Sequence, residues 1–125
     1  MPLRRAEVAA FLTAWAWQNS MVLDARALMQ PQELPSIDAY RIIILSLGSE
    51  TFDPSPALSF VLEMTSLAPA CPVVVLSDRV HQPDVLAAFQ ANAMGYLPSS
   101  LDPETALQAL SLILNGGHYY PAGVL

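Results

Sequence analysis

The apolar residues of this chain change between two spacings. Val8, Phe11, Leu12 and Trp15 recur at helical spacing, which predicts an amphipathic helix over residues 3–17. Four shorter apolar runs have the length and composition of strands. These predicted strands are Met21–Ala25, Ile42–Leu47, Val73–Ser77 and residues 95–99.

Helical segments are predicted between and after these strands. Each starts at a proline, which is favoured at the first position of a helix because it has no N–H to leave unpaired. The predicted helices run from Pro56 to about residue 67, from Pro83 to about residue 93, and from Pro103 to about residue 115, with a short helix or turn between Pro31 and Pro35. Strands separated by helices indicate a single α/β domain with a parallel sheet and helices on both faces.

The segment Ile42–Leu47 predicts a strand that is buried on both faces, because Ile42, Ile43, Ile44 and Leu45 are consecutive large aliphatic residues. Ser46 follows them, where ligands bind in open parallel sheets. A neutral serine at that position, with no charge beside it, is unusual for a reactive site.

Composition narrows the possible functions. The chain has 125 residues, of which 54% are hydrophobic and 13% charged, and these values fit a folded domain with a sizeable core. No apolar run approaches the roughly 18 residues of a membrane-spanning helix. A net charge of −6 argues against direct binding of nucleic acid. Cys71 is the only cysteine, which excludes an internal disulfide and fits a cytoplasmic location.

Three stretches, "IIILSLGSETFDPSPAL", "PVVVLSDRVHQPDVLAAFQANAMGYLPSS" and "ETALQALSLILNGGHYYP", resemble response-regulator receiver domains, most closely the NarL/LuxR type. The resemblance covers about residues 38–121. It implies a flavodoxin-like (CheY-like) three-layer sandwich from two-component signal transduction.

Receiver domains accept a phosphoryl group on an aspartate, with help from magnesium, a lysine and a hydroxyl group. The resemblance places Ser46 at the acceptor aspartate and Ser99 at the lysine, and the acidic metal-binding pair has no counterpart. Ser77 matches the switch hydroxyl and Tyr96 the switch aromatic. These matches imply a degenerate receiver that is not an enzyme and uses no metal or cofactor. Ser46 as an ordinary strand-end residue, and Ser77 and Tyr96 as inherited packing, remain open alternatives.

The first strand of the family also has no counterpart, because the chain starts at what resembles the family's first helix. We therefore expect a four-stranded sheet in which Met21–Ala25 pairs directly with Ile42–Leu47. A strand donated by another chain is the alternative.

The resemblance implies a phosphorylation-independent regulatory and dimerisation module, residues 1–125, of a DNA-binding transcription regulator. Residues 116–125 would lead toward a helix-turn-helix domain outside this chain, and DNA would be bound only through that domain. The alternative is a stand-alone module that senses a small molecule or binds a protein. A homodimer or protein contact is expected through the last helix, alone or together with the first helix. The residues expected at the interface are Val85, Leu86, Phe89, Leu107, Leu110, Ile113 and Leu114.

Overall fold

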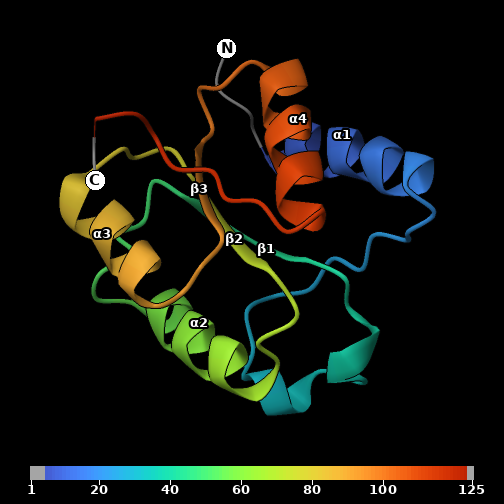
Figure 1. Ribbon diagram of the computed structural model, residues 1–125, viewed down its shortest axis with the longest axis horizontal. Helices are drawn as coiled ribbons and strands as arrows, with labels where there is room; N and C mark the ends of the chain where they lie inside the picture. Colours follow the sequence, from blue (N-terminus) through green and yellow to red (C-terminus); the bar gives the residue numbers. More distant parts are fainter. Residues whose placement is uncertain (1–4, 124–125) are drawn as a thin grey trace.

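Three parallel strands form the centre of the computed structural model, which describes residues 5–123. The elements in chain order are α1 (Arg5–Gln18), η1 (Pro31–Glu33), η2 (Ile37–Ala39), β1 (Ile43–Gly48), α2 (Pro56–Leu67), β2 (Val73–Ser77), α3 (Gln82–Gln90), β3 (Gly95–Pro98) and α4 (Pro103–Leu114). Residues 3–4 of the predicted first helix and residues 124–125 of the predicted exit segment lie outside the described residues. The predicted α/β fold, an open parallel sheet between helices, is confirmed (Figure 1).

The central strand β2 divides the core into two halves. Val73 and Val75 pack into one cluster with α2 and α3, and Val74 and Leu76 pack into a second cluster with α1 and α4. Because successive side chains of a strand point to opposite faces, the unbroken run of valines in this strand supplies both layers. Figure 1 shows α1 and α4 together on one side of the sheet and α2 and α3 on the other.

Side-chain caps fix where two of the helices begin. The Ser55 side chain accepts a hydrogen bond from the backbone N–H of Leu58 at 3.2 Å, and the Asp102 carboxylate accepts one from Thr105 at 3.4 Å. A proline follows each cap, as the sequence predicts.

The predicted strand Met21–Ala25 is wrong. These residues belong to no strand, and the described part of the chain has three paired strands rather than four, in the order β1-β2-β3. Met21 and Leu23 do pack into the core beside α1, while Val22 is 87% exposed. The segment thus has the side-chain alternation of a strand, but its backbone does not pair with β1.

The prediction that Ile42–Leu47 is buried on both faces is also wrong. Residues Ile43, Ile44 and Leu45 are only half-buried, and Ser46 is exposed. The reason is that β1 is an edge strand, which pairs with β2 on one side only. The apolar sequence shows that the strand is hydrophobic, but it does not show whether another strand or helix covers each of its sides.

The opposite edge of the sheet is covered by the segment that follows α4. The backbone N–H of Tyr96 donates to the carbonyl of Tyr119 at 2.9 Å, and the Tyr119 N–H donates to Met94 at 3.0 Å. The two edges of this small sheet therefore differ, since one is partly paired and the other is open.

Candidate functional site at the strand ends

The carboxyl ends of β1, β2 and β3 meet at one edge of the sheet, because the three strands are parallel. Three serines mark these ends: Ser46 in β1, Ser77 at the end of β2, and Ser99 just after β3. A register shift between Ser46 and Gly48 brings Gly48 opposite Ser77. The structure thus places all three serines at this edge of the sheet.

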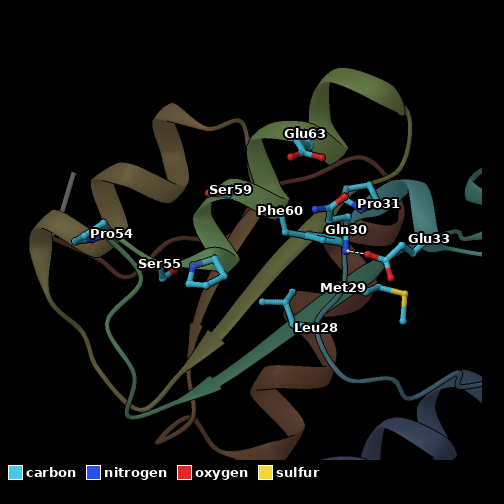
Figure 2. Close-up of a pocket in the computed structure, with 11 residues that line it drawn as sticks. Leu28, Met29, Gln30, Pro31, Glu33, Pro54, Ser55, Ser59, Phe60 and Glu63 are labelled. Atoms are coloured by element: carbon cyan, nitrogen blue, oxygen red, sulfur yellow. Dashed lines mark hydrogen bonds between the residues drawn. The ribbon is translucent and has the colours of Figure 1, made fainter.

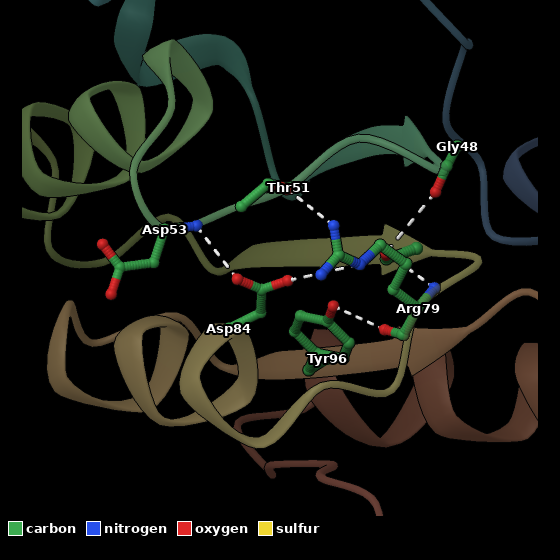
Figure 3. Close-up of polar contacts among 7 residues, drawn as sticks. Gly48, Thr51, Asp53, Arg79, Asp84 and Tyr96 are labelled. Carbon is green, nitrogen blue, oxygen red and sulfur yellow. Dashed lines mark hydrogen bonds and ion pairs between the residues drawn. The ribbon is translucent and has the colours of Figure 1, made fainter.

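Ser77 and Tyr96 both form hydrogen bonds with the backbone of Arg79 in the loop after β2, and Figure 3 shows the contact of Tyr96. The Ser77 hydroxyl oxygen accepts a hydrogen bond from the backbone N–H of Arg79 at 3.1 Å, and the Tyr96 hydroxyl donates to the Arg79 carbonyl at 2.7 Å. Tyr96 is fully buried, and this burial is the main cause that raises the pKa of its phenol. The tyrosine ring is thus turned into the protein and remains protonated at neutral pH.

The Arg79 side chain connects this loop to two other segments. Its Nη1 donates to the Thr51 hydroxyl at 2.6 Å, and its Nε lies 4.0 Å from Oδ2 of Asp84. Asp84 is 1% exposed, and its Oδ1 accepts the backbone N–H of Asp53 at 3.0 Å. Figure 3 shows that one guanidinium lies between the loop after β1 and the first turn of α3.

Asp84 Oδ2 has no hydrogen-bond donor among the described residues, so the guanidinium is the group that compensates its charge. A buried carboxylate is costly without a nearby positive charge or donors. The pair therefore constrains the positions of Arg79 and α3 relative to each other.

Ser99 and Ser46 have different surroundings. Ser99 is buried, and its hydroxyl donates a hydrogen bond to Oδ1 of Asp78, the residue that follows β2. Ser46 is exposed. The site thus contains hydroxyl groups, an arginine engaged with Thr51 and Asp84, and the carboxylates of Asp78 and Asp84, each of which has a partner.

Three members of this network, Thr51, Arg79 and Asp84, were not predicted from the sequence. The sequence contains only a weak signal for this contact. Arg79 precedes Asp84 by five positions, and Asp84 falls in the first turn of α3, which has a proline near its start. Asp84 influences the arrangement of the loops because its carboxylate is buried. Its burial depends on how the loop after β1 packs against α3, which the sequence does not show.

Metal binding would require several oxygen or nitrogen ligands at one place. Among the side chains described in residues 8–123, no group of three or more histidines, cysteines, aspartates or glutamates is arranged to hold an ion. None of the helices in this described part is long and apolar enough to span a membrane.

The residues predicted for a partner surface fall into three groups, which are buried, exposed and half-buried. Val85, Leu110 and Ile113 are buried in the core of this chain, because they face the sheet, so they do not form a surface. Leu86 and Phe89 are exposed on α3, and the other two residues, Leu107 and Leu114, are half-buried on α4.

No protein-family model matches the sequence, and no curated protein is significantly similar to it. Solved structures do match the fold. An orphan response regulator of H. pylori superimposes with a TM-score of 0.71 over 88% of this chain and 89% of that chain, at 18% identity. A response regulator from Thermotoga maritima gives 0.68 over 93% and 94%, at 14% identity.

A LuxR family DNA-binding response regulator from Silicibacter pomeroyi has 22% identity and a TM-score of 0.53, over 94% of this chain and 69% of that chain. At these identities the likeness concerns the fold. The chain has the CheY-like fold of response-regulator receiver domains, with three strands in its described part.

Proposed function

We propose that this chain is a receiver-like regulatory module that works without phosphorylation. The proposal rests on one observation: the carboxyl ends of the strands present Ser46 and Ser99 where the receiver resemblance implies an aspartate and a lysine. A serine hydroxyl is a weak nucleophile without a base to activate it, and the arginine at this edge is engaged with Thr51 and Asp84. Ser77 and Tyr96 keep their switch-like places and hold the Arg79 loop.

Treatment with acetyl phosphate and magnesium, followed by mass spectrometry of the intact chain, tests the proposal. We expect no stoichiometric gain of a phosphoryl group. Ser46→Asp alone is expected to gain none either, because the cation that would pair with the phosphate and the acidic metal ligands would still be missing. An aspartate-bearing receiver treated in parallel is the positive control. A stoichiometric gain on the unaltered chain contradicts the proposal.

Signalling without phosphate requires a partner, and we propose contact through α3 and α4 in a homodimer or with another protein. Leu86 and Phe89 support this proposal, because large apolar residues on one exposed helix face lose contact with water when a partner covers them. The predicted surface keeps these two residues together with Leu107 and Leu114.

Sedimentation equilibrium at micromolar concentration tests the association. We expect a monomer–dimer equilibrium that Leu86→Glu with Phe89→Glu shifts toward monomer. Leu62→Glu with Leu67→Glu is the matched control, since these residues of α2 are exposed to a similar degree, 52% and 53%. A monomer at all concentrations, also with the full-length protein added, contradicts the proposal, and so does an equal effect of the two pairs.

We further propose that the module is cytoplasmic and belongs to a transcription regulator whose DNA-binding part lies outside this chain, beyond residues 116–125. The net charge of −6 supports a separate DNA-binding part. The alternative of a small-molecule sensor at the strand ends has less support, because a groove of about 760 Å³ lies beside α2, lined by residues 28–31 and the start of that helix, and not at the strand ends.

A further inference from the structure

A groove separate from the strand ends runs between residues 28–33 and the first half of α2. Its volume is about 760 Å³, within the size range of ligand-binding clefts. Leu28, Met29 and Pro31 form one wall, and residues 54–56, 59 and 60 form the other (Figure 2). The groove is thus bounded by two segments that are distant in the sequence.

Slightly more than half of the groove lining is apolar, and its prolines reduce the number of backbone donors. Phe60 and Pro31 are buried beneath it, whereas Leu28 remains 50% exposed. Pro31, Pro54 and Pro56 line it and have no backbone N–H to offer. An occupant that covered this surface would gain from removing Leu28 and Met29 from water.

The charge of the groove is of one sign. Glu33 and Glu63 lie toward the end at Pro31, one on each wall (Figure 2), and no basic residue is among the described residues that line the groove. Among the side chains described in residues 8–123, the ion pairs are Arg26–Asp24 and Arg79–Asp84, and neither pair includes Glu33 or Glu63. Glu33 accepts only a 3.4 Å hydrogen bond from the backbone N–H of Gln30.

These features restrict what can fill the groove. A purely apolar occupant would remove two carboxylates from water without compensation. A simple amine would pair with the carboxylates but leave the exposed surface of Leu28 and Met29 uncovered. Arginine and lysine next to an aliphatic residue satisfy both demands, since their stems lie along apolar surface while the charged group reaches an anion.

We propose that this groove is a docking site for an extended peptide segment of a partner protein, in which basic and aliphatic residues alternate. The site lies outside the α3–α4 surface, and its assignment does not depend on the absence of phosphorylation. It has one structural link to the strand ends: Pro54 follows Asp53, whose N–H donates to Asp84. A bound segment would therefore contact the loop that the Asp84 carboxylate holds.

Fluorescence anisotropy with labelled octapeptides tests the proposal. The probe alternates leucine and arginine, and two comparison peptides alternate leucine with glutamate and serine with arginine. We expect the leucine–arginine peptide to bind most tightly and the leucine–glutamate peptide not to bind. Binding that is equally tight for serine–arginine, and that spermidine competes away, would overturn the proposal in favour of a simple cation site.

Substitutions of glutamates inside and outside the groove test where the peptide binds. Glu33→Gln with Glu63→Gln should weaken binding roughly tenfold, and glutamine at residue 33 can keep the capping interaction with Gln30. Glu50→Gln with Glu104→Gln, two exposed carboxylates away from the groove, is the control and should change binding less than about twofold.

A steric variant gives independent information. Ser59→Trp should block the groove, whereas Ser66→Trp, on the same helix but outside the groove, should not. Absence of binding by the leucine–arginine peptide, or equal losses in the groove and control variants, overturns the proposal.

Discussion

At the scale of single residues, Asp84 and Arg79 determine how the loops at the strand ends are arranged. The carboxylate is buried and the guanidinium is partly exposed, so the pair differs from an ordinary surface ion pair. Removing one partner leaves the other uncompensated, and removing both removes that penalty.

A double-mutant cycle tests this relation. Arg79→Gln and Asp84→Asn should each lower the free energy of unfolding by about 2 kcal/mol, and the double variant should lose less than the sum of the two. Urea unfolding followed by circular dichroism measures the effect. Arg26→Gln with Asp24→Asn is the matched control, because that pair is exposed and should show no measurable coupling. Additive losses at Arg79 and Asp84 would show that the two side chains act separately.

The strand-end serines and Tyr96 could be located from the sequence, because they end or lie within apolar runs whose strand character is clear. Arg79 and Asp84 could not be recognised as partners, because their contact depends on the path of the loop before α3. The burial of Val85, Leu110 and Ile113 could not be predicted for the same reason. The sequence alone does not show whether an apolar helix residue faces the sheet or a partner protein.

At the scale of elements, β3 and α4 approach each other unusually closely. A Cβ atom built at Gly95 would lie 2.6 Å from Cδ1 of Ile113 and 3.2 Å from the Tyr119 carbonyl oxygen. Glycine therefore allows the strand, the last helix and the segment after it to meet at one point.

We expect Gly95→Ala to lower the free energy of unfolding by about 1–3 kcal/mol, because the added methyl group overpacks this contact. Ile113→Val removes the Cδ1 atom and should recover part of the loss in the double variant. Gly48→Ala is a useful comparison, since Gly48 has a φ of 61° and open space around it, so its cost comes from backbone strain. Thermal unfolding measures all four variants, and no recovery in the double variant would contradict the steric explanation.

Periodicity and proline positions predicted all four helices and the three paired strands of the described residues to within a few residues. The predicted strand Met21–Ala25 was wrong. The alternation of apolar and polar side chains indicates which side chains face the core, but a strand also needs a neighbouring strand to pair with. The partner strand is a property of the whole sheet and leaves no local mark in the sequence.

At the scale of the molecule, the sheet is asymmetric. Tyr119 pairs with β3 at one edge, and β1 has a partner on one side only at the other. The exposed side of β1 carries no charged side chain between Ile43 and Gly48, although charges commonly protect such edges from association.

Because one side of β1 is unpaired, its amide hydrogens should exchange with solvent at two different rates. The Ile43 N–H donates to the Pro72 carbonyl at 2.9 Å, and successive N–H groups of a strand point in opposite directions. Every second amide of β1 should therefore exchange quickly with deuterated solvent, whereas the amides of β2, flanked on both sides, should exchange slowly. Residue-resolved exchange measured by NMR checks this alternation, and uniform protection along β1 would reveal that the edge is covered in solution.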